Sequence, residues 1–144
     1  MVKQILFVCK HNIFRSRIAE EFFKVLNKNK NYRASSAGII KWNNKDLKGD
    51  TGFDSEKRVA KEFGINLKVK SRGLDSSILK TTDTLIVVAD DVSLEIFRDK
   101  SFKGKLIVWK VSDVKQRDKK KDIIARNAVE EIEKRIKNLV GRLK

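Results

Sequence analysis

Short apolar runs alternate along the chain with segments in which apolar residues recur at helical spacing. The runs predict four β-strands, over Gln4–Cys9, Tyr32–Ala37, Thr84–Ala89 and Lys105–Trp109. The first and third are the most apolar, and their uninterrupted hydrophobic character is typical of strands that are buried on both faces.

Apolar positions three and four residues apart predict helices between and after these strands. The helices are expected over Arg17–Leu26, Lys57–Phe63, Asp75–Leu79, Val92–Phe97 and Asp122–Leu143. Asp54 is a candidate N-cap for the second helix, and Gly64 is placed to end it. Strands separated by helices indicate an α/β fold, in which helices cover both faces of a parallel four-stranded sheet. Such sheets bind ligands beyond the carboxyl ends of their strands.

The length of 144 residues predicts one domain over residues 1–144, and an apolar content of 40% is enough for a core. Basic residues outnumber acidic residues, 34 to 19, which gives a net charge of +15. Lys and Arg are mixed with Asp and Glu along the chain, so we interpret the charge as solvated faces. Attraction to an anionic partner, such as a phosphorylated protein, is the alternative. Because the chain carries no nucleic-acid-binding motif, we do not expect a nucleic-acid partner.

The chain contains a single Cys and a single His. One Cys excludes an internal disulfide and the multi-Cys zinc patterns, and one His counts against a His-built metal site. No apolar run approaches the roughly 20 residues of a membrane-spanning helix. The apolar stretch near the N-terminus is too short for a signal peptide. We therefore expect a monomeric cytoplasmic protein without a metal ion, a cofactor or a membrane partner.

Candidate chemistry gathers where the first predicted strand ends, at Cys9, and continues to Ser16. A tight loop between a strand and a helix turns its backbone N–H groups inward, and the helix N-terminus adds positive potential. This environment favours the thiolate form of Cys9, which is the nucleophilic form. Arg15 follows closely enough to grip two oxygens of a phosphate, and Ser16 can donate its hydroxyl to the thiolate. The alternative is a buried, inert thiol that ends a core strand.

The loop reads CKHNIFRS and is followed in the helix by Ala19 and Glu20. It resembles the signature C-x-G-N-x-C-R-S, with its A-E helix, of the low-molecular-weight protein tyrosine phosphatases. Further segments are similar to the family in order and spacing, and together they cover nearly the whole chain: SSAG at 35–38, GIN at 64–66, SR at 71–72, VAD at 88–90 and VSD at 111–113. The resemblance implies the family's flavodoxin-like fold, of the phosphotyrosine phosphatase I type.

The resemblance also implies a two-step phosphoryl transfer from phosphotyrosine in proteins. Cys9 attacks phosphorus to form a phosphocysteine, Arg15 stabilises the phosphoryl oxygens, and Asp113 protonates the leaving group and then activates water. This chemistry needs no metal ion, because Arg15 and the loop amides supply the positive field. Substrate contacts are expected from the rest of the loop and from one aromatic wall: Lys10, His11, Asn12, Ile13, Phe14, Ser16 and Trp42.

Several of these residues have alternative interpretations. Asp118 is the nearest rival to Asp113 as the acid. Asn12 is either an ordinary loop residue or a left-handed corner that its side chain locks, for instance against Ser36. Trp42 is as consistent with core packing as with a pocket wall, and Ser16 with a helix cap. For His11 we prefer solvent exposure to a role as a catalytic base, and Asp90 can anchor the carboxyl edge of the sheet.

The chain also departs from the family pattern. Phe14 replaces the second Cys of the loop, so the reversible disulfide that protects many members cannot form. His11 replaces Gly, Arg17 replaces the common Pro, and Val114 replaces the Pro after the acid. Two other functions stay open beside the phosphatase. One is an arsenate reductase that uses an external thiol, and the other is a non-catalytic phosphate- or phosphopeptide-binding module.

Overall fold

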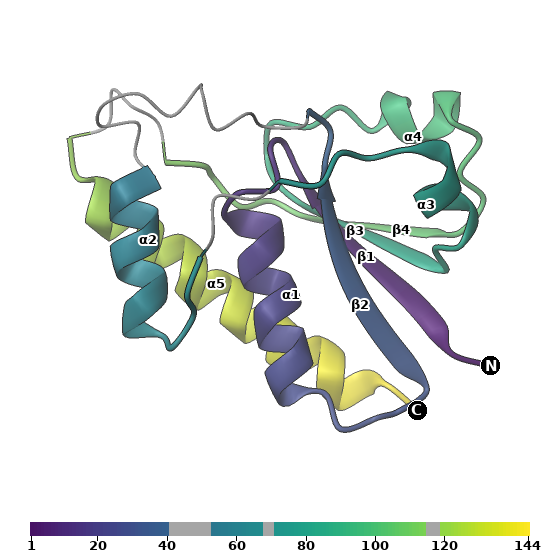
Figure 1. Ribbon diagram of the computed structural model, residues 1–144, viewed down its shortest axis with the longest axis horizontal. Coiled ribbons are helices and arrows are strands. Elements are labelled where there is room, and N and C mark those ends of the chain that lie inside the picture. The colour runs from purple at the N-terminus through teal and green to yellow at the C-terminus, as the bar shows by residue number, and fades with distance from the viewer. Residues whose placement is uncertain (41–52, 68–70, 115–118) are drawn as a thin grey trace.

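The computed structural model describes residues 1–40, 53–67, 71–114 and 119–144. Within these ranges the chain alternates between strands and helices, as Figure 1 shows. The strands are β1 (Lys3–Cys9), β2 (Tyr32–Gly38), β3 (Thr84–Val88) and β4 (Lys105–Trp109). The helices are α1 (Arg15–Leu26), α2 (Phe53–Glu62), α3 (Ser76–Lys80), α4 (Glu95–Asp99) and α5 (Lys121–Arg142).

The strands form one parallel sheet in the order β2-β1-β3-β4, which confirms the predicted four-stranded parallel sheet. The chain turns to one side of β1 to build β2 and then crosses to the other side to build β3 and β4. The strand order therefore changes direction at β1, and a crevice is expected beyond its carboxyl end. Cys9 pairs with Gly38 at that end of the sheet.

The alternation of side chains along the strands produces a hydrophobic core on each face of the sheet. Ile5 and Phe7 of β1 face α1, α2 and α5, and lie in the larger core. Leu6 and Val8 face the opposite side, where Ile78 of α3 and a residue of α4 close a smaller core. Figure 1 shows the same division, with α3 and α4 on one side of the sheet and the three longer helices on the other. Both faces of β1 are covered, which explains its continuous apolar sequence.

Helix boundaries differ from the sequence-based expectations near their N-termini. Helix α1 begins at Arg15, two residues early, so that Arg15 and Ser16 lie in its first turn. Asp54 lies inside α2 rather than at its cap. Asp75 is the N-cap of α3, where its side chain accepts from the N–H of Ile78. Helix α4, by contrast with α1, begins later than expected, at Glu95. Gly64 follows α2 with a φ of 81°, as expected for a residue that ends a helix.

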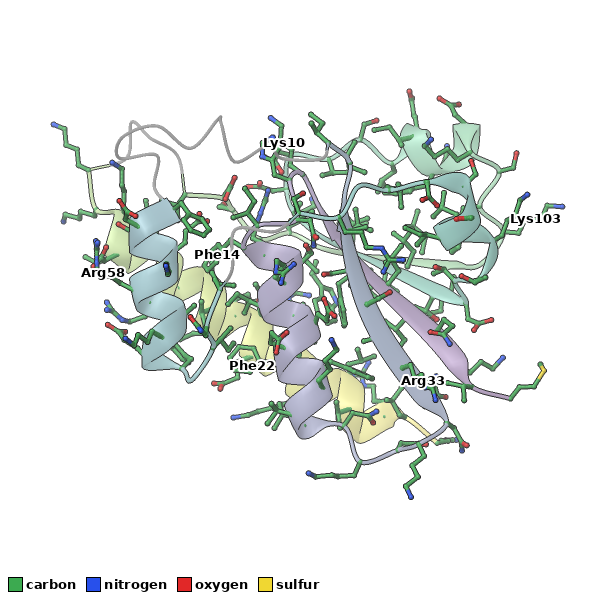
Figure 2. All side chains as sticks on the ribbon, viewed as in Figure 1. Lys10, Phe14, Phe22, Arg33, Arg58 and Lys103 are labelled. Carbon is green, nitrogen blue, oxygen red and sulfur yellow. The ribbon has the colours of Figure 1, made fainter. Side chains whose placement is uncertain are left out.

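The basic side chains are spread over the molecule. Figure 2 places Lys10, Arg33, Arg58 and Lys103 on widely separated parts of the structure. Several exposed cations also pair with carboxylates, for example Arg126 with Glu62 at 2.9 Å and Arg58 with Asp122 at 2.9 Å. This distribution agrees with solvated faces. Among the described helices, none is both long and apolar enough to cross a membrane.

Candidate active site

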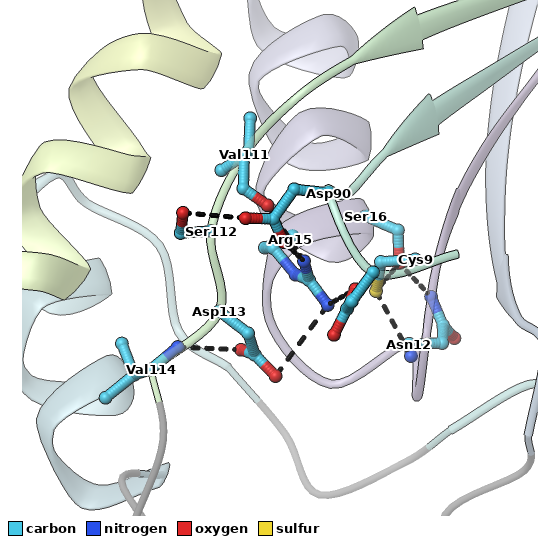
Figure 3. A network of polar contacts seen from close by, with 10 residues as sticks. Cys9, Asn12, Arg15, Ser16, Asp90, Val111, Ser112, Asp113 and Val114 are labelled. Carbon is cyan, nitrogen blue, oxygen red and sulfur yellow. Dashed lines mark hydrogen bonds and ion pairs between the residues drawn. The ribbon is translucent and has the colours of Figure 1, made fainter. Parts of the chain in front are cut away.

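Cys9 ends β1, and its sulfur faces the loop that leads into α1 (Figure 3). The residue is 3% exposed. Its Sγ lies 3.0 Å from Ser16 Oγ and accepts a hydrogen bond from the backbone N–H of Asn12 at 3.3 Å. A backbone N–H thus points at the sulfur, and the Ser16 hydroxyl lies within hydrogen-bonding distance of it. The loop therefore surrounds Cys9 with the groups that a nucleophilic thiolate needs.

Asn12 holds this arrangement in place. Its backbone has a φ of 56°, and the residue is fully buried. The side-chain oxygen accepts from the N–H of Arg72 at 2.9 Å, so the amide nitrogen must point the other way. That nitrogen donates to Ser16 Oγ at 2.7 Å and to Ser36 Oγ at 2.9 Å. Because Ser16 accepts this bond, its own proton is available to Cys9 Sγ. The predicted left-handed corner at Asn12, locked against Ser36, is confirmed.

The loop is braced from β2 and from the segment that precedes α3. A Cβ atom at Gly38 would lie 2.6 Å from the carbonyl carbon of His11 and 2.8 Å from the nitrogen of Asn12, so only glycine fits there. Ser71 donates from its hydroxyl to the His11 carbonyl at 2.6 Å. The Ser36 hydroxyl donates in turn to Glu20 of α1 at 2.5 Å. These contacts give a physical reason for the small and polar residues at positions 35–38 and 71–72.

Arg15 is the cation of the site, and it is 2% exposed. Nη1 donates to the Val111 carbonyl at 2.8 Å, and Nη2 lies 3.0 Å from Asp91 Oδ1 and 3.7 Å from Asp113 Oδ2. Burial alone lowers the pKa of the guanidinium, but attraction to Cys9, Asp113 and Asp91 outweighs it, so the pKa lies above its ordinary value. Arg15 therefore stays charged and connects the loop to the ends of β3 and β4.

Asp113 lies across Arg15 from Cys9, in the connection between β4 and α5 (Figure 3). It is 27% exposed, and its Oδ1 accepts from the N–H of Val114 at 2.9 Å. The side chains of Val111 and Val114 are buried on either side of it. The structure thus brings together Cys9, Arg15 and Asp113, the three residues expected to carry the chemistry.

Two acidic neighbours complete the surroundings of Arg15. Asp90 accepts from the Ser112 hydroxyl at 2.8 Å and lies 3.7 Å from Arg15 Nη1, so it links the ends of β3 and β4. This agrees with the anchoring role considered for Asp90. Asp91 makes the shorter ion pair with Arg15, and sequence reasoning missed it. Its position directly after the third apolar run was the available signal, because the carboxyl ends of parallel strands meet at one edge.

Sequence reasoning also missed Glu56, in the first turn of α2. The residue is 6% exposed, and its carboxyl lies close enough to Asp113 to interact with it directly. Burial raises the pKa of Glu56 well above its usual range, and repulsion from Asp113 adds to the effect. No local pattern marks Glu56, because it sits in a charged stretch of a helix that reads as solvated.

The remaining predicted contacts divide into three groups. Ile13 and Phe14 are both buried in the larger core, so only their backbone is placed to meet a ligand. Lys10 and His11 are partly exposed at the loop. Burial lowers the pKa of His11, and the nearby positive charge of Lys10 lowers it further, which keeps the imidazole neutral near pH 7. Trp42 lies outside the described residues, as does Asp118, the rival candidate for the acid.

Comparison with known proteins agrees with this architecture. A family model described as low molecular weight phosphotyrosine protein phosphatase matches residues 4–144. The chain therefore belongs to this family of phosphatases.

Solved structures of similar fold include proteins with several different activities. An arsenate reductase from Archaeoglobus fulgidus is 30% identical, with a TM-score of 0.70 and coverage of 96% of this chain and 99% of that one. A low molecular weight protein tyrosine phosphatase from T. tengcongensis is 23% identical (TM-score 0.71, coverage 98% and 99%). The YwlE arginine phosphatase from Geobacillus stearothermophilus is 20% identical (TM-score 0.68, coverage 97% and 92%). The last two show the fold alone, and no curated protein matches the chain.

Proposed function

We propose that this protein hydrolyses phosphotyrosine in proteins through a phosphocysteine intermediate. The observation that carries the proposal is the meeting of three groups: a sulfur with two hydrogen-bond donors, a buried guanidinium, and a carboxyl across from it. Membership of the phosphatase family supports it. A module that only binds phosphate would need the guanidinium and the loop amides, but neither the sulfur nor Asp113.

In the first step Cys9 Sγ attacks phosphorus in line with the departing phenolate oxygen. Charge develops on the phosphoryl oxygens, and the loop amides and the Arg15 guanidinium are positioned to stabilise it. Arg15 has more N–H donors than Val111 and Asp91 take up, so donors remain for the phosphate. Asp113 gives a proton to the phenolate oxygen as the P–O bond breaks.

In the second step water attacks the phosphocysteine. Asp113 accepts a proton from the water, the P–S bond breaks, and Cys9 leaves as a thiolate. The Ser16 hydroxyl, 3.0 Å from the sulfur, stabilises that leaving group. The same hydrogen bond that supports the nucleophile in the first step thus lowers the barrier of the second.

The rim of the loop is compatible with an aromatic substrate group. Ile40 is 51% exposed, and its N–H donates to the carbonyl of Lys10 at 2.9 Å, which holds it beside the loop. An exposed aliphatic side chain at this position can pack against an aryl ring, which a phosphoserine lacks. The partly exposed, neutral His11 offers a second surface at the same rim. These contacts favour phosphotyrosine over aliphatic phosphate esters.

A substrate profile tests the proposal. Phosphate release is measured for three peptides of one sequence that carry phosphotyrosine, phosphoserine or phosphoarginine. We expect the phosphotyrosine peptide to have the highest kcat/KM, by at least about tenfold, because only its ring can use the rim. Ile40→Ser serves as the matched variant, and it should narrow the preference without abolishing turnover. A faster reaction with phosphoarginine or phosphoserine would refute the assignment.

Arsenate reduction is the second candidate, because the arsenate reductase from Archaeoglobus fulgidus is 30% identical over 96% of the chain. Reduction of arsenate to arsenite takes two electrons, and a chain with one Cys cannot supply them by forming an internal disulfide. Two thiols would have to provide them by forming a disulfide, either Cys9 with one external thiol or two external thiols. Arsenite formation from arsenate and glutathione, measured beside phosphopeptide hydrolysis, decides between the two activities.

Oxidation of Cys9 is expected to be poorly reversible. Phe14 occupies the loop position where a second Cys would stand, and Cys9 is the only Cys of the chain. A sulfenic acid at Cys9 therefore has no internal partner and proceeds to the sulfinic acid when no thiol is present. Peroxide treatment without thiol, followed by reduction, should leave most activity lost and a sulfinic acid detectable by mass spectrometry. Full recovery without sulfinic acid would contradict this expectation.

A further inference from the structure

Glu56 is a buried carboxyl that the mechanism above does not use. It enters from α2, a helix that contributes none of the three catalytic candidates. Only 6% of the residue is exposed, and its Oε2 is buried without a hydrogen-bond partner among the residues that the structure describes. A buried carboxylate oxygen without a donor is strongly unfavourable, whereas a neutral carboxylic acid brings its own O–H donor. The geometry thus favours the protonated form.

The charged groups around Glu56 also favour its protonated form. Three charged groups act on it electrostatically: Asp113 in the connection after β4, Arg15 of α1 and Cys9 at the end of β1. Arg15 is shared with two further carboxylates, Asp90 and Asp91, after β3. Two further ionisable groups, His11 and Lys10, lie in the loop beside this cluster, and His11 interacts with both Asp113 and Arg15. On the same helix as Glu56, Arg58 pairs with Asp122 of α5. One buried cation cannot balance every carboxylate and a phosphate dianion as well, so a neutral Glu56 relieves the excess negative charge.

We propose that Glu56 is a positioning residue that shares one proton with Asp113. This carboxyl pair keeps the acid of the reaction protonated near neutral pH. The proposal rests on the proposed phosphatase function. An isolated aspartate is ionised at pH 7 and has no proton to give. Two carboxyls that interact strongly release their protons in separate steps, and the second proton is retained to higher pH.

The proton balance of the reaction follows. As the Sγ–P bond forms and the P–O bond breaks, the phenolate oxygen takes a proton from Asp113, which is resupplied by Glu56. The pair is then fully ionised beside Arg15. Attack of water on the phosphocysteine breaks the P–S bond, and the proton released by that water returns to the pair. An acid that titrates near the working pH serves both steps, because it can give a proton in one and accept it in the other.

The test compares the pH dependence of kcat/KM for wild type and Glu56→Gln with the phosphotyrosine peptide. Gln keeps the size and the donor but cannot share a proton. We expect the basic limb of the profile to move to lower pH by about one unit or more, which is a tenfold loss at a pH on that limb. Rates should converge toward acidic pH. p-Nitrophenyl phosphate, whose leaving group departs without a proton, should show a much smaller change.

Glu62→Gln is the matched control, because Glu62 is an exposed carboxylate on the same helix, paired with Arg126. It should leave both pH profiles in place. An unchanged basic limb in Glu56→Gln would overturn the proposal and leave Glu56 a buried structural residue.

A second measurement does not depend on the substrate, and so it separates this proposal from the proposed function. Burial raises the pKa of Glu56 in the folded protein, so the folded state binds one proton more than the unfolded state above the ordinary pKa of Glu. Stability should therefore fall as pH rises between the two pKa values, by up to about tenfold in the unfolding equilibrium constant per pH unit. Glu56→Gln should lack this loss, and Asp113→Asn should reduce it. A constant stability difference between wild type and Glu56→Gln from pH 5 to pH 8, values chosen to lie above the ordinary carboxyl range, would overturn the proposal.

If Glu56→Gln does not fold, carboxyl-labelled wild type replaces it. One glutamate carboxyl should keep its proton at neutral pH by carbon NMR, and its titration should shift in Asp113→Asn. Spectra in which every glutamate is ionised at pH 7 would refute the shared proton.

Discussion

Replacement of Cys9 by Ser is expected to abolish turnover while phosphate binding remains. The hydroxyl of Ser is hardly ionised near neutral pH, so it cannot replace the thiolate as a nucleophile. The loop itself should persist, because its corner depends on Asn12, whose bonds to Ser36 and Arg72 do not involve the sulfur. Arg15 also keeps its contacts with Val111 and Asp91. The loss should exceed that of any other single substitution considered above.

Two measurements check this prediction. Single-turnover assays with the phosphotyrosine peptide give the residual rate. Calorimetry gives the affinity of the loop for inorganic phosphate. Ser16→Ala is the companion variant, since it removes only the hydroxyl 3.0 Å from the sulfur and should slow the reaction without stopping it. Substantial turnover by Cys9→Ser, in protein verified by mass spectrometry, would contradict the assignment of Cys9 as nucleophile.

Replacement of Asp113 by Asn is expected to slow hydrolysis in proportion to the basicity of the leaving group. A general acid contributes about 10²–10⁴-fold, and it matters most when the leaving group is poor. The loss should be small for p-nitrophenyl phosphate and large for phosphotyrosine, whose phenolate is more basic. Asn keeps an Oδ1 that can accept from Val114, so the backbone of this connection should be preserved. The buried side chains of Val111 and Val114 fix Asp113 although no proline follows it.

The measurement is the phosphorylation-step rate for a series of aryl phosphates in wild type, Asp113→Asn and Asp118→Asn. Only Asp113→Asn should steepen the dependence of the rate on leaving-group pKa. Asp118 is the appropriate control, because it is the nearest acidic residue in the sequence and was the rival candidate. If Asp118→Asn alone steepens the dependence, Asp118 is the acid and the roles assigned around Arg15 have to be revised.

The sequence was most informative where function depends on residues that are close together in the chain. The apolar runs at Ile5–Cys9 and Leu85–Ala89 predicted buried strands, because short continuous apolar runs are typical of parallel strands that are covered on both faces. The loop from Cys9 to Ser16 was readable for the same reason, since a strand, a turn and a helix start follow one another there. The tolerance of Asn12 for a left-handed backbone is likewise local, whereas its bonds to Ser36 and Arg72 come from the tertiary structure.

Helix boundaries were less predictable. Helix α1 begins at Arg15 rather than Arg17, and Phe14 at its N-cap provides no side-chain hydrogen bond. Capping preferences therefore gave no signal at this position, and burial of Phe14 in the core decides it instead. At α2 the same preferences suggested Asp54 as the cap, whereas that residue lies within the helix.

The strands and the loop that carries Cys9, Arg15 and Ser16 were thus predictable from the sequence alone. The groups that surround Arg15 depend on how distant segments pack in three dimensions. Asp90, Asp91 and Asp113 reach it because β3 lies beside β1 and β4 lies beside β3, with the carboxyl ends of all three strands at one edge of the sheet. Glu56 reaches Asp113 because α2 packs against the same face of the sheet as α1 and α5. Hydrophobic periodicity fixes the face that a helix buries but not its neighbours, so charge pairing between distant segments has no signature in a single sequence.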